Sequence, residues 1–282
     1  MSTKNRHVED PPTAADMADI PAAYRGLTNI PYCKEIAEFC HLAPPEPKNP
    51  ALGHFFSLRF KSLSRLLTDR LKAKNIFELA TGLSPRGLIM TKDPGVNYLA
   101  TDHRRYEELK LAFLYYLNQE KRREHDNLFV EKLDALDEER FPLISGLLPG
   151  PVAIIHEGLF RYLSPDQKSK LARTINKALV EQGGCWITPD IPTLKEHNCF
   201  ASLTGEAPID HTLVGRTASG VPTYHFFNKE NARAFFQAHG FEVESVRCLD
   251  LVPEMTEDLT EHEFNYLDGK ALWIMTPQQS DF

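Results

Sequence analysis

Residues 76–87 read IFELATGLSPRG, and this stretch decides the fold. Residues 76–80 form a short, mostly apolar run that is typical of a buried β-strand. Gly82 follows in a turn, where glycine permits a tight bend and lets the backbone approach a ligand. Because ligands of open α/β sheets bind at the carboxyl ends of strands, this turn is a candidate binding segment. The stretch is not a GxGxxG sequence, so it gives poor support for a pyrophosphate site.

Short apolar runs alternate with longer amphipathic segments on the carboxyl side of this stretch. Ser164, Pro165 and Gln167 have the spacing of a capped helix start, and Gly183 predicts the end of that helix. Strands that alternate with helices predict an α/β fold with a mostly parallel, seven-stranded sheet that is flanked by helices. We expect its strands at residues 76–80, 96–101, 127–133, 151–156, 185–188, 241–249 and 270–275.

The chain is expected to divide into three parts. Residues 1–20 are polar and contain few large apolar groups, which predicts a disordered segment. Residues 21–73 are expected to form an N-terminal helical cap, and residues 74–282 the sheet domain. An insert at residues 189–227 shows no helical or strand period, and loops of this length are often substrate-binding elements or lids.

Composition excludes several classes of function. The net charge of -7 without a long basic block argues against binding of nucleic acid or of an anionic membrane surface. The five cysteines include no CxxC pair, which predicts neither a zinc site nor a disulfide framework. Without an apolar leader or a long apolar run, we expect a cytoplasmic protein, either a monomer or a homodimer.

Three acidic residues follow predicted strands and are candidate ligand contacts. Asp102 lies 20 residues after Gly82, where a carboxylate can accept hydrogen bonds from ribose hydroxyls, although it can also cap the next helix. Asp134 can reach an adenine edge or lie in an ordinary acidic loop. Glu157 directly follows a buried strand, so it is expected to meet either a ligand or a structural partner such as Arg161.

These segments together resemble a known family. ELATGLSPRG at 78–87, ATD at 100–102, LDAL at 133–136 and EGLFRYLSPDQ at 157–167 are similar, in order and spacing, to the leucine carboxyl methyltransferase family. This family belongs to the class I S-adenosylmethionine-dependent methyltransferases. The similarity is greatest to its polyketide carboxyl O-methyltransferase-like branch, and it spans roughly residue 52 to the end. It implies a Rossmann-like sheet that ends in an antiparallel hairpin.

The resemblance also implies a cofactor, S-adenosylmethionine, with S-adenosylhomocysteine as the product and no metal. Arg59, with Lys61 as a second candidate, matches the cation that holds the methionine carboxylate of the cofactor. The cofactor-binding positions that the resemblance implies are Arg59, Lys61, Glu78, Thr81, Gly82, Asp102, Asp134, Ala135, Glu157 and Gly158. This chain has ATGLSPR where the commoner family form has a Gly-rich GAGxDTR, and the basic stretch 103–105 also departs from the pattern.

The acceptor determines which further residues matter. A carboxylate is already ionised at neutral pH and needs no general base. A phenol or an alcohol needs one, and the candidates for a catalytic role are Tyr162, which is the family's tyrosine, and the loop histidines His211 and His225. The residues that we expect to bind the acceptor are Phe55, Phe56, Phe200, Arg216 and Tyr224.

The sequence thus predicts an S-adenosylmethionine-dependent O-methyltransferase that acts on a carboxylate of a small molecule, such as a polyketide-like secondary metabolite. Three alternatives stay open: methylation of a protein C-terminal carboxylate, a nucleotide-binding oxidoreductase, and an interaction protein that keeps the fold without turnover.

Overall fold

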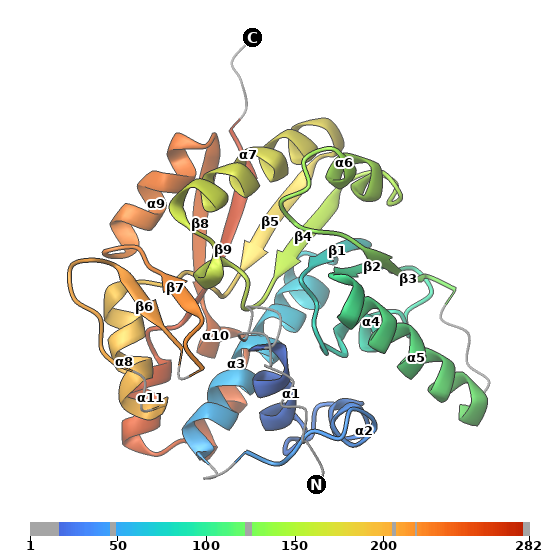
Figure 1. Ribbon diagram of the computed structural model, residues 1–282. Coiled ribbons are helices and arrows are strands. Elements are labelled where there is room, and N and C mark those ends of the chain that lie inside the picture. The colour runs from blue at the N-terminus through green and yellow to red at the C-terminus, as the bar shows by residue number, and fades with distance from the viewer. Residues whose placement is uncertain (1–16, 46–48, 122–125, 205–206, 218, 279–282) are drawn as a thin grey trace, which may run out of the picture.

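The computed structural model describes residues 17–45, 49–121, 126–204, 207–217 and 219–278. Its centre is a seven-stranded sheet with the order β3-β2-β1-β4-β5-β9-β8 (Figure 1). The strands β1 to β5 are parallel, while β9 is antiparallel to both β5 and β8. The predicted mostly parallel sheet with a terminal antiparallel hairpin is confirmed.

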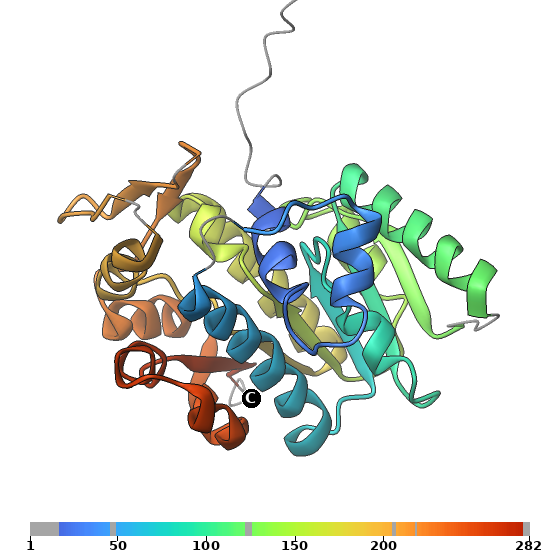
Figure 2. The ribbon, with the colours of Figure 1, turned by 90° about the horizontal axis from the view of Figure 1, so that it is seen from below.

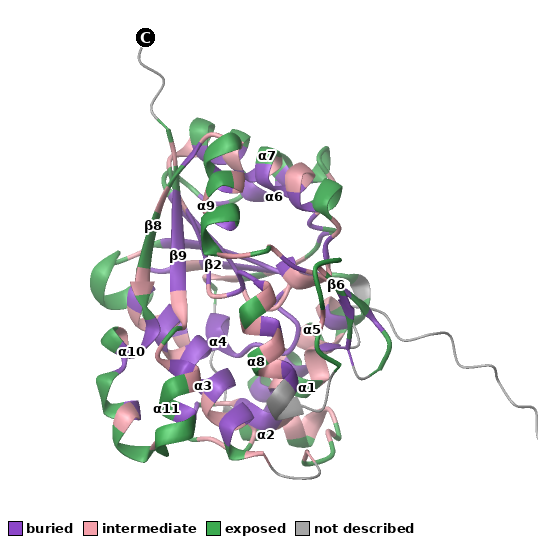
Figure 3. Ribbon diagram, turned by 90° about the vertical axis from the view of Figure 1, so that its left-hand side faces the viewer, coloured by how far each residue is buried: buried purple, intermediate pink, exposed green. Residues whose placement is uncertain are grey.

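The strands lie close to their predicted positions. Their bounds are β1 Asn75–Leu79, β2 Asn97–Asp102, β3 Leu128–Lys132, β4 Val152–His156, β5 Gly184–Thr188, β8 Phe241–Arg247 and β9 Ala271–Pro277. Every residue of β1 and β4 is buried, as expected for central parallel strands that helices cover on both faces. In contrast, β8 forms an edge and is largely exposed, whereas β9 beside it is buried (Figure 3).

Alternate residues of the central strands enter two separate cores. Phe77, Leu79 and Ile154 point to one face, where they pack with residues of three helices: α6 (Arg140–Ser145), α7 (Pro165–Gln182) and α9 (Lys229–Ala238). Ile76 and Ile155 point to the other face, which is covered by α3 (Pro50–Arg65), α10 (Cys248–Leu251), a 3-10 helix (Pro253–Asp258) and α11 (Glu261–Leu267). Burial of each large apolar side chain contributes about 1.5–3 kcal/mol.

Three N-terminal helices lie on the side of the sheet toward which the parallel strands run (Figures 1 and 2). They are α1 (Asp19–Arg25), α2 (Cys33–Phe39) and α3, which continues into a π-helical turn at Leu66–Arg70. The helix α2 packs with α4 (Arg86–Met90) and α5 (Arg104–Lys121) in a smaller apolar cluster. The chain therefore places a helical layer over the end of the sheet at which folds of this kind bind ligands.

Side-chain hydrogen bonds fix the starts of two helices, and the one at Ser164 confirms the prediction. The Ser164 hydroxyl accepts from the backbone N–H of Gln167, and the Gln167 side chain accepts from the Ser164 N–H, which completes a capping box for α7. The Asn228 side chain caps α9 by accepting from the Asn231 N–H at 2.8 Å. These caps fix where the two helices begin against the first core.

The prediction that residues 189–227 lack regular structure is wrong. The segment contains α8 (Leu194–Thr204) and a two-stranded hairpin of β6 (Val214–Arg216) and β7 (Pro222–Tyr224). The helix buries His197 and Ala201, which are polar and small, so no aliphatic period marks it. Strands of three residues are too short to show a period of two.

Two predicted boundaries also differ. The strand expected at 241–249 ends at Arg247, because Cys248 begins the short buried helix α10. Of the segment 1–20 that was expected to be disordered, residues 1–16 lie outside the described part of the chain. Residues 17–20 are helical, and Met17 is buried.

Gly184 marks a close approach between two strands. Its φ of +108° is in a region that side-chain-bearing residues rarely adopt, and a Cβ there would lie 2.0 Å from the Val152 carbonyl oxygen. Only glycine fits at this position, which starts β5 beside β4.

Candidate functional site

A cavity of about 400 Å³ lies at the carboxyl ends of β1, β2 and β4. The sheet order reverses between β1 and β4, and such switch points are where open α/β sheets bind ligands. The cavity is bounded by residues 80–83, 102–103 and 157–159 from the sheet, and by residues of α1, α3, α8 and the β6–β7 loop. Its volume is in the range of small-molecule and cofactor sites.

Asp102 ends β2 and lies in the cavity wall. Its carboxylate accepts hydrogen bonds from the backbone N–H groups of Gly82, at 2.5 Å, and His103, at 2.7 Å. Burial raises the pKa of Asp102, and the two N–H donors partly oppose that rise. The carboxylate holds the turn after β1 rather than capping α5, which starts two residues later at Arg104.

Gly82 lies in that turn with φ +48°, the left-handed region in which glycine carries no steric cost. A Cβ at Gly82 would lie 2.8 Å from the Cβ of Ala18, just before α1. Thr81, the preceding residue, accepts a hydrogen bond at 2.8 Å from Lys110 Nζ, whose pKa burial lowers to about 8. The turn is thus fixed from three sides: by β2, by α5 and by the N-terminal segment.

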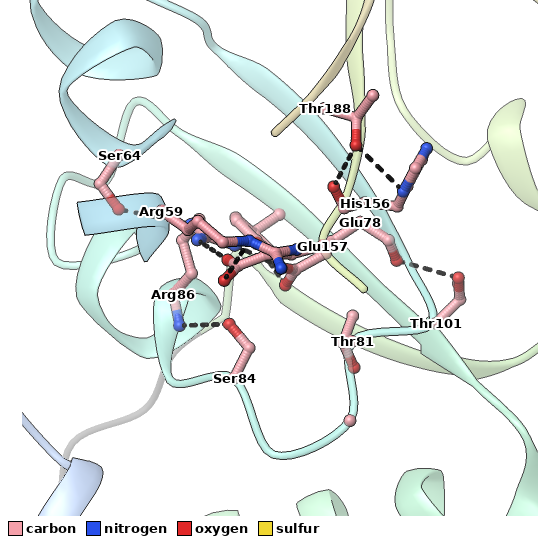
Figure 4. Close-up of polar contacts among 12 residues, drawn as sticks. Arg59, Ser64, Glu78, Thr81, Ser84, Arg86, Thr101, His156, Glu157 and Thr188 are labelled. Atoms are coloured by element: carbon pink, nitrogen blue, oxygen red, sulfur yellow. Dashed lines mark hydrogen bonds and ion pairs between the residues drawn. The ribbon is translucent and has the colours of Figure 1, made fainter. Parts of the chain in front are cut away.

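A buried cluster of charges lies beside the cavity (Figure 4). Arg86, which is fully buried, donates to Glu78 on β1 and, at 2.7 Å, to Glu157 after β4. Glu78 also accepts a hydrogen bond from the Tyr98 hydroxyl at 2.6 Å. Because guanidinium is planar and keeps its charge, a single arginine can bridge two carboxylates from neighbouring strands.

Two more arginines approach Glu157 from the N-terminal helices. Arg25 of α1 donates to its carboxylate at 3.4 Å, and Arg59 Nε of α3 lies 3.8 Å away. Burial alone raises the pKa of Glu157, but Arg86, Arg25 and Arg59 outweigh it, so the pKa lies below its usual value. The carboxylate is therefore ionised at neutral pH.

The cluster has one positive charge in excess, since three guanidinium groups face the two carboxylates of Glu78 and Glu157. Within the described ranges, Arg59 Nη2 and Arg25 Nε are buried and have no hydrogen-bond partner. Both arginines line the cavity. A buried cation that lacks part of its hydrogen bonding favours an anionic ligand group beside it.

The remaining wall of the cavity is aromatic. Phe55 and Phe56 of α3 lie 5.3 Å apart between ring centroids, and Phe55 lies 5.4 Å from Phe200 of α8. Tyr24 packs on Phe56 at 5.7 Å. Arg161 lies 5.4 Å above the ring of Phe200, so one cation also borders this apolar side.

Ten of the predicted site residues come together at the cavity. They are Phe55, Phe56, Arg59, Thr81, Gly82, Asp102, Glu157, Gly158, Tyr162 and Phe200. Glu78 lies behind the wall, where it pairs with Arg86 instead of lining the cavity.

The structure places other predicted cofactor residues away from this cavity. Lys61 is on α3 but does not line it. Asp134 is exposed, and its carboxylate accepts from the Leu136 N–H at 2.9 Å. Ala135 is buried in the core that covers the α6 and α7 face.

Apart from Phe200, the predicted acceptor and base residues of the insert also lie outside the cavity wall. Arg216 is exposed and donates to the Gly220 carbonyl at 2.7 Å, within its own hairpin. The carbonyl of Tyr224 accepts from Lys168 Nζ at 2.9 Å. His211 is exposed and stacks on Phe227. His225 is buried in a neighbouring small cavity, where burial lowers its pKa to about 3, so it is a poor base at neutral pH.

Arg25 and Arg86 are site residues that the sequence analysis missed. Arg86 lies inside the ELATGLSPRG stretch, and the expectation that Glu157 needs a partner pointed to Arg161, the nearest arginine in sequence. The partner is instead Arg86, 71 residues away. An acidic residue after a buried strand together with an arginine in the preceding glycine turn is the signal that identifies this pair.

The described residues contain neither a candidate metal site nor a candidate membrane-spanning helix. No group of three His, Cys, Asp or Glu side chains there is arranged to hold a metal ion. None of the helices in these ranges has the length and apolar character that a membrane span requires.

Comparison with known proteins shows similarity at the level of structure. No family model and no curated protein sequence matches the chain. A protein of Thermobifida fusca YX assigned as a methyltransferase is similar with a TM-score of 0.52 and 16% identity, over 96% of this chain and 100% of that chain. The methyltransferase domain of bacterial CtHen1-CN is similar with a TM-score of 0.52 and 13% identity, over 78% of this chain and 98% of that domain. The chain therefore has the Rossmann-like class I fold of these methyltransferases.

Proposed function

We propose that the protein is an S-adenosylmethionine-dependent O-methyltransferase that acts on a carboxylate of a small molecule, such as a polyketide-like secondary metabolite. One observation carries the proposal: Asp102 and Arg59, a carboxylate and an incompletely paired cation, line the same cavity at the switch point of the sheet. The methyltransferase fold and the family resemblance support it.

The residues present fit the cofactor. S-adenosylmethionine carries a ribose diol, an α-carboxylate and a positively charged sulfonium. Asp102 has lone pairs left to accept from the ribose hydroxyls, because a carboxylate has about four acceptor sites and the N–H groups of Gly82 and His103 use two of them. Arg59 and Arg25 supply the charge that a buried carboxylate needs. Gly82 keeps the turn free of a side chain where the backbone meets the ligand.

When bound, the cofactor supplies the methyl group and the leaving sulfide of an in-line displacement. The chain's own residues position the two reactants and exclude water. The Glu78–Arg86–Glu157 bridge fixes the ends of β1 and β4 relative to each other. The rings of Phe55, Phe56 and Phe200 give the acceptor an apolar wall. Proximity and orientation of this kind contribute up to about 7–11 kcal/mol to catalysis.

His103 lines the cavity next to Asp102, whereas the two histidines that were expected as bases do not. His211 and His225 do not line it, and the pKa of His225 is too low for a base at neutral pH. A carboxylate needs no base, because it is already ionised. Tyr162, which lines the cavity, is assigned the role of orienting the acceptor.

Calorimetric titration with S-adenosylmethionine tests the proposal. The wild-type protein is expected to bind the cofactor in the micromolar range, and Asp102→Ala is expected to weaken binding at least tenfold, or about 1.4 kcal/mol. The matched control is Asp93→Ala, which removes an exposed carboxylate that pairs with Lys74 far from the cavity and is expected to bind like wild type.

If the folded wild-type protein binds no cofactor, the proposal is wrong. If both aspartate variants bind equally well, Asp102 is not the ribose contact and the assigned site is wrong. Binding that depends on Asp102 justifies a methylation screen that starts with small aromatic and polyketide-like carboxylic acids, with the corresponding alcohols as the comparison.

A further inference from the structure

A second, smaller cavity adjoins the main one. It has a volume of about 60 Å³, room for roughly two water molecules at about 30 Å³ each, which is the size of a carboxylate. Phe55, Arg59, Arg161 and Phe200 line both cavities, so the two cavities share a border at these side chains. We call the smaller cavity the annex. Its wall also includes Tyr266 of α11 and Lys270, the residue just before β9.

Lys270 brings a positive charge into the annex. Its Nζ lies 4.4 Å from the centroid of the Tyr266 ring and 5.5 Å from that of Phe55. Burial lowers the pKa of Lys270, and Glu196 partly opposes that change. None of the ion pairs among the described residues joins Lys270 to a carboxylate: its ammonium group lies over two aromatic rings, and Glu196 acts on it from a longer distance.

Tyr266 adds a hydrogen-bond donor in the same place. Its hydroxyl oxygen is buried and has no hydrogen-bond partner in the part of the chain that the structure describes. Buried hydroxyl groups are almost always hydrogen-bonded, so an unused one in a cavity calls for an explanation. Burial raises the pKa of this hydroxyl, which therefore keeps its proton and can donate it.

The two carboxylates of the annex already have partners. Asp190 accepts from the backbone N–H of Phe160 at 2.8 Å, and Glu196 lies 3.8 Å from Lys229 Nζ. The rings of His197 and His225 lie 4.5 Å apart between centroids. His225 is uncharged at neutral pH, because its pKa is lowered to about 3. The annex therefore places the Tyr266 hydroxyl among three cationic side chains, Arg59, Arg161 and Lys270, against two carboxylates, so its lining has one positive charge in excess.

We propose that the annex binds a second acidic group of the acceptor, a carboxylate, which accepts a hydrogen bond from the Tyr266 hydroxyl and is neutralised by Lys270. Because these contacts occupy the lone pairs of this carboxylate, the carboxylate anchors the acceptor. The methyl group is transferred to a different oxygen of the acceptor. The inference rests on the proposed function and narrows it: the acceptor has one oxygen nucleophile in the main cavity and a separate acid in the annex.

Titration with benzoate, compared with benzamide, tests the annex without the cofactor or the true acceptor. Ligand-observed NMR is expected to show millimolar benzoate binding to wild type, at least tenfold weaker binding to Lys270→Met, and severalfold weaker binding to Tyr266→Phe. Benzamide, which has the same shape without the charge, is expected to bind weakly and equally to all three proteins. Lys74→Met, at an exposed lysine far from the annex, is the matched control and is expected to bind benzoate like wild type.

The proposal is overturned if folded wild type does not bind benzoate, if benzamide binds as well as benzoate, or if neither variant weakens benzoate binding. Tyr266→Phe removes a single oxygen and keeps the test valid if Lys270→Met does not fold. Binding of S-adenosylhomocysteine, measured on the same proteins, is expected to be the same in all of them. Its loss in every protein overturns the proposed function, whereas loss of the benzoate preference alone overturns only the annex.

Discussion

At the scale of single residues, Arg86 is the side chain on which the site depends. It is fully buried and joins Glu78 to Glu157. Removal of one partner from a buried ion pair leaves an uncompensated charge, which typically costs 3–5 kcal/mol. We therefore expect Arg86→Met to lower the free energy of unfolding by about 3–5 kcal/mol in urea titrations.

An exposed arginine provides the comparison. Arg65 pairs with Glu254 through two hydrogen bonds, but both side chains are about half exposed. Arg65→Met is expected to cost no more than about 1 kcal/mol. Equal losses in the two variants would contradict the structural role given to Arg86, and Arg86→Lys is expected to recover only part of the loss, since lysine cannot bridge two carboxylates in the same plane.

The contrast between Asp102 and Arg86 shows what the sequence can predict about residues. Asp102 could be predicted because it ends a strand, and the ends of parallel strands meet at one edge of the sheet. The partners of Arg86 lie 8 and 71 residues away, so no local pattern joins them. The same reason explains why Arg216 and His211 were expected at the site, although Arg216 is exposed on the β6–β7 hairpin and His211 is exposed in the turn before it.

At the scale of elements, the start of α7 provides a test of local stability. The Ser164 hydroxyl satisfies the N–H of Gln167, one of the donors that a helix start leaves open. Ser164→Ala is expected to lower the free energy of unfolding by about 1 kcal/mol. Ser164→Gly is the matched control and is expected to cost only a few tenths of a kcal/mol. Thermal or urea unfolding measures both, and a neutral Ser164→Ala would show that the cap adds nothing.

Elements were predictable where the signal lies within a few residues of the chain. The cap at Ser164 is such a signal, and its helix starts where expected. The helix α8 was missed because tertiary contacts stabilise it instead: the Asn198 amide exchanges two hydrogen bonds with Ile209, and His197 bonds to the Ala207 carbonyl. Hydrogen bonds between a helix and a later loop do not produce a helical period in the sequence, so this helix could not be predicted from periodicity.

At the scale of the whole molecule, buried histidine makes stability depend on pH. Burial lowers the pKa of His156 from 6.5 to about 4. Below pH 6.5 the unfolded chain binds a proton that the folded chain does not bind until about pH 4. The folded state therefore loses stability as the pH falls from 6.5 to 4, by at most about 1.4 kcal/mol per pH unit for this group.

His156→Phe measures the contribution of this residue. The ring of His156 packs on Phe160 and Trp186, so phenylalanine keeps an aromatic side chain in place. Urea unfolding between pH 4 and 6.5 is expected to show a smaller slope of free energy against pH in the variant than in wild type. Parallel curves for the two proteins would mean that His156 does not titrate as described.

The sheet could be predicted from the alternation of strands and helices in the sequence, but the cluster of charges at its carboxyl end could not. Seven strands were expected and found in this sheet, and the central strands β1 and β4 are short runs of buried residues. The helical layer over the sheet brings Arg25 and Arg59 to Glu157, and that meeting depends on how three separate segments pack. The charge excess that supports the proposed function is therefore a property of the assembled molecule.

The distance in sequence between Arg25 and Glu157 has a consequence for synthesis on the ribosome. Arg25 is made 132 residues before Glu157. At about 5–20 residues per second, α1 waits roughly 7–26 s for its carboxylate partner. During that interval the arginines of α1 and α3 have no β4 to dock against. The nascent chain can therefore form the contacts of Arg25 and Arg59 with Glu157 only after more than half of the protein has been translated.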